Sequence, residues 1–210
     1  IVDVGPRSAH IANVGYACFT DPELFEGASL YYMQPRENDP SDYVAIRLNN
    51  GESVTITNTC AANVLGILAE GDYARGNVES ATKAIKLLAD EVGMSVQDTA
   101  RTILQKSTDK IKPVIEDLIR KYKIERDQIV LVGAGGGAGT LLTFTANDMG
   151  FKYQIPENAE VISSIGVALA MVREMVERTI PNPTAQDIAQ LKKEAKELAM
   201  NSGAVEDSIE

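Results

Sequence analysis

The sequence of 210 residues contains only two cysteines, Cys18 and Cys60, and a single histidine, His10. Two cysteines are too few for a disulfide-stabilised secreted scaffold, and they lack the paired spacing with further cysteines or histidines that a zinc site requires. We therefore expect two buried thiols. A single histidine on a strand is more often structural than catalytic, although His10 remains a candidate for catalysis.

The chain also lacks an apolar run near the ~18 residues that a membrane-spanning helix needs, and it lacks the pattern of a signal peptide. The formal net charge is −10, and no stripe of lysine and arginine interleaves with aromatic residues. A nucleic-acid backbone would be repelled by such a chain. These features predict a cytoplasmic protein that has neither a membrane nor a nucleic acid as its partner.

The sequence also lacks an initiating methionine, and an apolar strand pattern begins directly at Ile1. We therefore expect a fragment of a longer protein. A hydrophobic content of 44% over this length supports one good core, since a chain of this size buries about 70% of its unfolded surface. We place one main domain at residues 1–180 and a C-terminal helix and tail at residues 184–210.

The most informative stretch that is present runs from Ile129 to Gly139, an apolar segment that ends in five glycines within seven residues. It predicts a buried strand, a turn that contacts a phosphate or nucleotide, and a helix from Thr140. Glycine permits positive φ and close approach of a ligand to backbone N–H groups, and a helix N-terminus attracts anions. The candidate cofactor-binding residues are Gly133, Gly135, Gly136 and Gly137.

The same stretch satisfies the dinucleotide fingerprint of a Rossmann unit as Gly133-x-Gly135-x-x-Ala138, with Glu157 as the acidic residue that follows. After the short strand expected at 152–155, however, the chain offers one long helical pattern over 161–179 and then a polar tail. No further parallel strands are available to build the sheet, which disfavours dinucleotide binding.

A second motif lies at the start of the chain, where an apolar strand ends at Asp3-x-Gly5 and a second strand follows over 10–14. In a strand–turn–strand clamp, turn N–H groups and the hydroxyl of Ser8 can hold phosphate oxygens, while Asp3 can hold Mg²⁺ through water. Arg7 can serve as a cation for phosphate. Hairpins with Asp and Gly at the turn also occur for purely conformational reasons.

Four stretches together resemble the hydantoinase/oxoprolinase family. Asp3 to His10 stands where that family has an Asp-x-Gly-Gly-Thr-Ser-Thr-Asp turn, and Thr55 to Gly66 corresponds to its Thr-Val-Thr-Asp-Ala-Asn-x-x-Leu-Gly segment. The glycine-rich loop and Ser163-Ser-Ile-Gly166, against the family's Ser-Ala-x-Gly, complete the likeness. The departures are Pro6 and Arg7 in place of Gly-Thr, His10 in place of an acidic residue, and Cys60 near the Asp of the family's Thr-Asp-Ala-Asn segment.

The resemblance implies an α/β domain of the ribonuclease-H-like type, as in a lobe of the actin-like ATPases, with a mixed five-stranded sheet flanked by helices. The first three strands would be antiparallel. It also implies ATP and Mg²⁺ as cofactors. The phosphates would lie near Asp3, Gly5, Arg7 and Ser8, and the adenosine near Gly133 to Gly139. Asp3 and His10 are then the candidates for catalytic residues.

By the same resemblance, the chain would be the nucleotide-binding lobe of an ATP-dependent amidohydrolase that phosphorylates a cyclic amide or imide to activate ring opening. Its partners would be that small cyclic substrate and a missing N-terminal lobe or second subunit, without which the fragment is expected to be inactive. Two alternatives are a non-catalytic ATPase-like module, such as a reactivating chaperone, and a degenerate lobe that serves only assembly.

Local patterns predict the remaining elements. Strands are expected at 1–4, 10–14, 43–48 and 53–57, with Asn49-Asn50-Gly51 as a hairpin turn, and 20–42 is expected to be an exposed excursion. Helices are expected from Asn77, from a capping box at Ser95, over 161–179 and from Thr184. Pro113 is expected to kink or restart the second of these helices.

Overall fold

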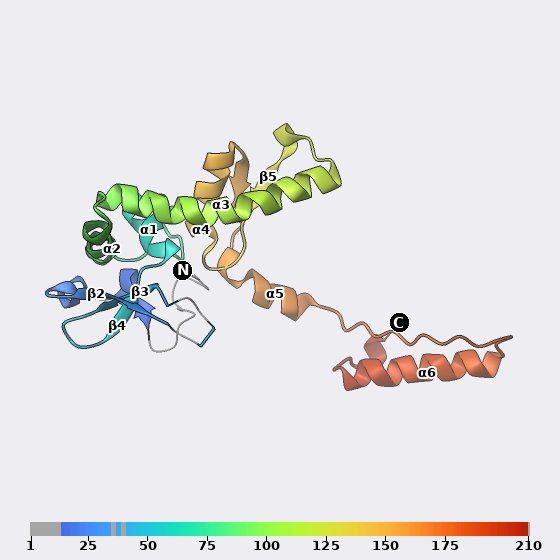
Figure 1. Cartoon of the computed structure of the whole chain (residues 1–210). Coiled ribbons are helices and arrows are strands. Elements are labelled where there is room, and N and C mark those ends of the chain that lie inside the picture. The colour runs from blue at the N-terminus through green and yellow to red at the C-terminus, as the bar shows by residue number, and fades with distance from the viewer. Residues whose placement is uncertain (1–13, 35–36, 39–40, 210) are drawn as a thin grey trace. The chain divides into compact units, whose positions relative to one another are not determined.

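The computed structural model describes residues 14–34, 37–38 and 41–209 (Figure 1). Contacts within the chain divide it into two compact units, Ile1–Ser163 and Ser164–Glu210, which are described separately below. The predicted strand at 1–4 and almost all of the predicted strand at 10–14 lie outside the described residues. The same holds for the candidate site residues of the first motif, which are Asp3, Gly5, Arg7, Ser8 and His10.

The first unit contains a four-stranded mixed sheet. Its strands are β1 (Gly15–Tyr16), β2 (Ser29–Met33), β3 (Tyr43–Arg47) and β4 (Ser53–Thr55), in the order β1-β4-β3-β2. β1 runs parallel to β4, whereas the other neighbouring strands are antiparallel. The predicted hairpin between β3 and β4 is confirmed, and its turn uses the positive φ of 84° at Gly51.

The strand β2 corrects the expectation of an exposed excursion over 20–42. It pairs with β3 along its whole length, from Ser29 opposite Arg47 to Met33 opposite Tyr43. Leucine and two tyrosines fill the middle of this strand, and aromatic side chains suit a pleated, half-buried surface. The surrounding proline and acidic residues obscured this short signal in the sequence.

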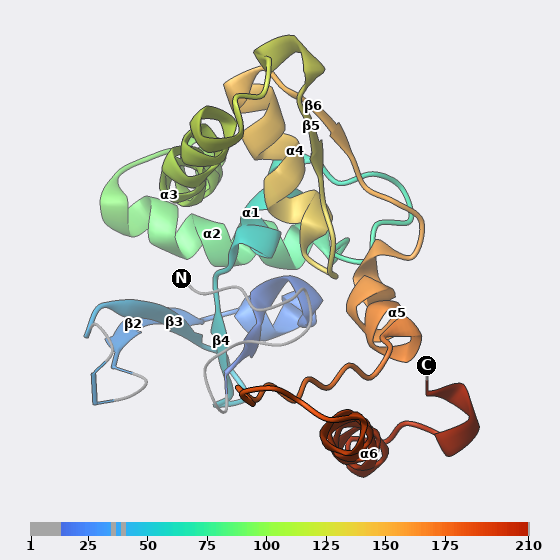
Figure 2. The ribbon, with the colours of Figure 1, turned by 90° about the vertical axis from the view of Figure 1, so that its right-hand side faces the viewer.

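Four helices complete most of the first unit, namely α1 (Asn58–Leu65), α2 (Val78–Val92), α3 (Val96–Tyr122) and α4 (Ala138–Met149). The short α1 contacts the other three helices, and Figure 2 shows it among them. All seven residues from Asn58 to Val64 are buried. α1 is therefore the central helix of the unit, although its residues show no amphipathic pattern.

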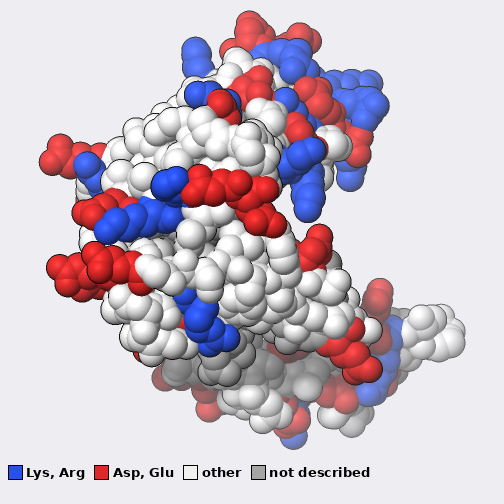
Figure 3. Space-filling model, turned by 60° about the vertical axis from the view of Figure 1, so that its left-hand side comes forward, with Lys and Arg blue, Asp and Glu red and all other residues white. Residues whose placement is uncertain are grey.

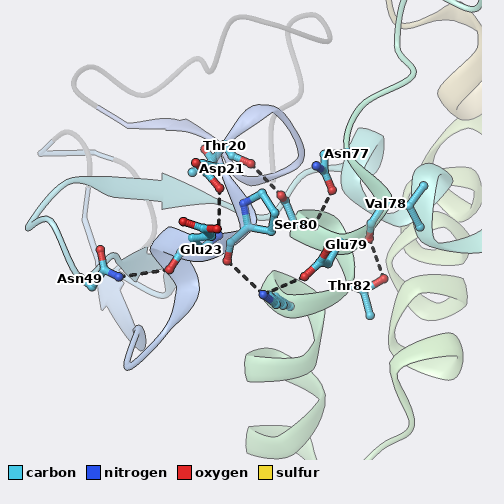
Figure 4. Close-up of polar contacts among 11 residues, drawn as sticks. Thr20, Asp21, Glu23, Asn49, Asn77, Val78, Glu79, Ser80 and Thr82 are labelled. Atoms are coloured by element: carbon cyan, nitrogen blue, oxygen red, sulfur yellow. Dashed lines mark hydrogen bonds and ion pairs between the residues drawn. The ribbon is translucent and has the colours of Figure 1, made fainter.

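The start of α2 is fastened to the segment that follows β1 (Figure 4). Asn77 caps the helix by accepting a hydrogen bond from the Ser80 N–H at 3.0 Å, and the Ser80 hydroxyl donates to the Thr20 carbonyl at 2.6 Å. Lys83 donates to the Pro22 carbonyl at 3.2 Å and pairs with Glu79. These contacts hold residues 18–22 against the first turns of α2.

The helix α3 begins as predicted, because Ser95 accepts a hydrogen bond from the Asp98 N–H at 3.1 Å. It then continues through Pro113 to Tyr122 as one helix of 27 residues. The expected restart at Pro113 is therefore not observed.

Two further strands, β5 (Val130–Val132) and β6 (Lys152–Gln154), form a separate parallel pair joined through α4. Within the described residues the fold is thus mixed α/β, with a four-stranded sheet and a two-stranded sheet. The single five-stranded sheet that we expected, with its first three strands antiparallel, stays a prediction, because the strands expected at 1–4 and 10–14 lie almost wholly outside the described residues.

From Ile162 onward the chain forms α5 (Ile162–Leu169), then an irregular stretch, and then α6 (Ala185–Asn201). The predicted helix over 161–179 is wrong beyond Leu169. Residues 170–179 are mostly exposed, and a helix gains most of its stability from packing an apolar face. The predicted start of α6 is confirmed by a capping box, in which the Thr184 N–H donates to Asp187 at 2.8 Å and the Asp187 N–H donates to Thr184 at 3.3 Å.

Short 3-10 helices occupy several connections: η1 (Ala17–Phe19), η2 (Pro22–Phe25), η3 (Arg126–Gln128), η4 (Ala159–Val161) and η5 (Glu206–Ser208). A cluster of buried apolar side chains in the first unit joins β1, η1, β3 and β4 to α1, α2 and α3. Among the described residues, no helix combines the length and apolarity needed to cross a membrane. On the face drawn in Figure 3, acidic and basic side chains lie beside one another.

Candidate functional site

The glycine-rich stretch forms the predicted order of strand, loop and helix, but the expectation that the strand is buried is wrong. Val130 and Val132 of β5 are 48% and 65% exposed, because β5 belongs to a small two-stranded sheet. β5 ends at Val132, the loop spans 133–137, and α4 begins at Ala138. Gly135 has a φ of 90°, which strongly favours glycine. The loop is fixed at two points, because the Gly133 N–H donates to the Gln154 carbonyl at 2.9 Å and the Gly135 N–H donates to the Ala159 carbonyl at 2.6 Å.

Several other backbone N–H groups at this loop are unpaired within the described part of the chain. Those of Ala134, Gly136, Gly137 and Gly139 have no hydrogen-bond partner among the described residues, and no side chain caps α4 at Gly137. The first N–H groups of a helix carry partial positive charge and seek acceptors. The loop therefore offers a set of donors for the oxygen or nitrogen acceptors of a ligand.

Of these donors, Ala134, Gly136 and Gly137 border a cavity of about 550 Å³. The candidates Gly133, Gly135, Gly136 and Gly137 all line it, so the structure brings the predicted residues of this motif together. Apolar side chains form most of the remaining wall, from α3, β5 and α4: Ile111, Ile115, Leu131, Val132, Ala138, Leu141 and Leu142. A mostly apolar pocket with a few fixed polar groups is typical of a small-molecule site.

Buried hydroxyl groups join α4 to its neighbours, and two of them, on Thr140 and Thr145, belong to residues that line the cavity. The hydroxyls of Thr140 on α4 and Thr59 on α1 lie 3.5 Å apart, and those of Thr145 on α4 and Thr108 on α3 lie 3.0 Å apart. An ion pair joins Lys112 on α3 to Asp148 on α4. The hydrogen bond to Asp148 raises the pKa of Lys112 above its ordinary value.

The sequence interpretation missed Asp72, whose carboxylate lies against the first turn of α4. A Cβ placed on Gly139 would lie only 2.0 Å from Asp72 Oδ2. Asp72 Oδ1 accepts a hydrogen bond from the Ala74 N–H at 2.8 Å, while Oδ2 has no partner in the described part of the chain. The residues around Asp72 do not reveal that it will contact α4. That contact forms only when the connecting segment folds back onto the helix.

The buried side chain of Asn63 on α1 holds that segment in place. Its amide nitrogen donates to the carbonyls of Thr59 and Ala74 at 2.9 and 3.0 Å, and its oxygen accepts from the Gly76 N–H at 2.8 Å. A buried amide with three satisfied hydrogen bonds strongly specifies the conformation around it. Asn63 therefore positions the segment that carries Asp72.

The described residues contain no group of three or more His, Cys, Asp or Glu side chains placed to hold a metal ion. Asp3, the predicted Mg²⁺ residue, lies outside them, and so do the catalytic candidates Asp3 and His10. Both cysteines are free thiols and buried, as expected. Cys60 lies in α1, within the segment that Thr57 caps.

The described molecule is thus a mixed α/β domain in which a glycine-rich loop joins a strand to the N-terminus of a helix. The same fold occurs in a solved nucleotide-free structure of acetone carboxylase, an enzyme of ATP-dependent acetone carboxylation. The TM-score is 0.50 at 18% identity, over 85% of this chain and 29% of that chain. The chain therefore spans less than a third of the protein it resembles.

The chain belongs to the hydantoinase/oxoprolinase family, whose model matches residues 1–176. Among curated proteins, none matches this sequence. The family match covers both the N-terminal motif and the glycine-rich loop, which are the stretches on which the sequence interpretation rested.

Proposed function

We propose that this chain is the nucleotide-binding lobe of an ATP-dependent amidohydrolase that acts on a cyclic amide or imide. One observation carries the proposal. The free N–H groups of Gly136 and Gly137 border an apolar cavity of about 550 Å³ at the N-terminus of α4. Membership of the hydantoinase/oxoprolinase family supports this function, and the ATP dependence named for the acetone carboxylase neighbour agrees with it.

In this proposal the acceptor atoms of the nucleotide bind the loop N–H groups, and the adenosine packs against the apolar wall near Ile111 and Leu142. The fold is a ribonuclease-H-like lobe of the actin-like ATPase type. The phosphates and Mg²⁺ lie at the first motif, near Asp3, Gly5, Arg7 and Ser8. Mg²⁺ usually keeps several waters and binds one or two carboxylates, and Asp3 supplies one.

The chemistry itself requires a second lobe. Phosphoryl transfer depends on positioning and on stabilisation of charge on the transferred group from all sides. We propose that an N-terminal lobe or another subunit completes the site, that the assembled enzyme works in the cytoplasm, and that it phosphorylates the amide oxygen before the ring opens. The chain alone then binds ATP weakly and turns it over negligibly.

The test is calorimetric titration of ATP into the assembled protein and into two variants. Gly137→Val places a side chain in open space at an unstrained φ of −100°, so the domain should melt as the unchanged protein does. ATP affinity should fall at least about tenfold, or about 1.4 kcal/mol, because the side chain covers the loop N–H groups. Gly166→Val, which also enters open space but lies on α5, is the matched control.

Equal affinity in the Gly137 and Gly166 variants would reject the loop as the nucleotide site. If ATP binds at the loop but the assembled protein opens no cyclic amide or imide, a non-catalytic ATPase-like module replaces the amidohydrolase. Full turnover by the chain alone would contradict the need for a second lobe.

A further inference from the structure

The two cysteines of the chain lie together in the core of the first unit. Cys18 belongs to η1 and Cys60 to α1, two elements that pack against each other. Each is 0% exposed, and a hydrogen bond joins the two side chains. Residues far apart in the sequence thus place both thiols of the protein at one point.

The surroundings of Cys60 favour its thiolate form. Cys60 is the third residue of α1, where the positive end of the helix dipole acts. The Thr57 hydroxyl donates to Cys60 Sγ at 3.5 Å and also accepts from the Cys60 N–H at 3.3 Å. Burial raises the pKa of Cys60, but the hydrogen bonds from Cys18 and Thr57 lower it to about 7.

The backbone of Cys18 is fixed as well. Its carbonyl accepts a hydrogen bond from the Asn77 N–H at 2.7 Å at the start of α2. Gly76 approaches the same carbonyl so closely that a Cβ there would lie 2.5 Å from the oxygen. Both cysteines therefore lie on well-packed elements, and their side chains are in contact before any reaction begins.

We propose that Cys18 and Cys60 are a peroxide-oxidisable dithiol that closes into an intramolecular disulfide. The Cys60 thiolate attacks one oxygen of hydrogen peroxide, which breaks the O–O bond, forms a sulfenic acid and releases hydroxide. The Cys18 sulfur then attacks Cys60 Sγ, the S–O bond breaks, and the Cys18 proton leaves with the hydroxyl group as water. The dithiol loses two electrons and two protons, and one peroxide becomes two waters.

The burial of Cys18 and Cys60 favours a small oxidant over a large one. Hydrogen peroxide is small and uncharged and differs little from water in size, so local opening of the core admits it. Oxidised glutathione is a charged hexapeptide-sized molecule that cannot enter without extensive unfolding. The two thiols are already neighbours, because η1 and α1 pack against each other and a hydrogen bond joins the two side chains.

The direct test uses the unchanged chain. It is treated with hydrogen peroxide, unfolded with an alkylating agent and digested with trypsin, and the peptides are identified by mass spectrometry. Peptide 8–36, which carries Cys18, should be joined to peptide 48–75, which carries Cys60. Oxidised glutathione at equal concentration should react at least about tenfold more slowly, as burial demands. Separately alkylated peptides, or disulfides between two chains, would overturn the proposal.

Two variants test the order of the steps. Cys18→Ser should leave Cys60 as a sulfenic acid that dimedone traps when the oxidised chain is unfolded in its presence. Thr57→Val should raise the pH at which peroxide oxidation reaches half its maximal rate, because Cys60 loses a donor, while Thr57→Ser should restore the original profile. Should dimedone instead label Cys18 in Cys60→Ser at the rate of the intact pair, the assignment of Cys60 as the attacking sulfur would be wrong.

Discussion

At the scale of single residues, the glycines of the loop have different roles. Gly135 supplies a positive φ, whereas Gly133 provides room, because a Cβ there would lie 2.7 Å from Leu142 Cδ2. Gly137 faces open space, and Gly139 makes room for Asp72. The run of glycines therefore predicted the position of the loop. It could not distinguish the glycines that the backbone conformation or close packing requires from those that are open to a ligand.

The contact between Gly139 and Asp72 predicts a non-additive pair of substitutions. Gly139→Ala improves helix propensity by about 1 kcal/mol, yet it displaces the Asp72 carboxylate and breaks its 2.8 Å hydrogen bond to the Ala74 N–H. We expect net destabilisation of about 1 kcal/mol. In an Asp72→Ala background the same change should stabilise the protein.

Urea unfolding of the four proteins in this cycle measures the coupling. Gly150→Ala is a poor comparison because its φ is positive, so Gly166→Ala, in open space on a helix, serves as the control and should be insensitive to Asp72. Strict additivity of the Gly139 and Asp72 changes would show that the two residues do not interact in solution.

At the scale of elements, the sequence predicted those with a local signal. Ser95 and Thr184 each start a helix with a side-chain cap, and the turn at 49–51 joins two strands. The positions of the strand and the helix around the glycine-rich loop were also predicted correctly, although the strand is exposed rather than buried. These features depend on residues within a few positions of one another, so no knowledge of the tertiary fold was needed.

The missed elements depend on packing. α1 is buried on every side and carries threonine, asparagine, alanine and cysteine, so it shows no apolar stripe. β2 is short and is defined by pairing with β3. For the site, the glycines of 133–137 were predictable, but Asp72 and Asn63 act through long-range contacts that no local pattern contains.

Proline inside α3 leads to a prediction at this scale. Pro113 cannot donate the backbone hydrogen bond of a helix interior, and its side chain is exposed. Pro113→Ala should therefore stabilise the first unit, by up to about 3 kcal/mol. Thermal unfolding followed by circular dichroism gives the change. Val114→Ala at the adjacent exposed position is the control, and a melting temperature lowered by Pro113→Ala would contradict the reasoning.

At the scale of the whole molecule, the chain consists of two units of unequal internal packing. Among the described residues, those at 170–183 belong to no helix or strand, and Arg173 is exposed and has no ion pair, whereas Arg178 pairs with Glu194 at 2.9 Å. Segments of this kind are preferred sites of proteolysis.

Limited trypsin digestion should therefore cut first after Arg173 within residues 41–209. Intact-mass measurement over time identifies the fragments, and Arg173→Gln should move the first cut to Arg178. Early cleavage within α3, for example after Arg101, would show instead that the first unit opens more readily than the connecting stretch.

The three fastenings of α4 have a mechanical consequence. Thr140 near its start, Thr145 in its middle and Asp148 near its end each meet a different partner, on α1 or α3. A helix held by contacts at three positions along its length can neither rotate about its axis nor shift along it without breaking these contacts. Contacts outside the loop therefore fix the direction in which the loop N–H groups point. Thr108 does not line the cavity, yet its contact with Thr145 helps to orient the N–H donors that line it.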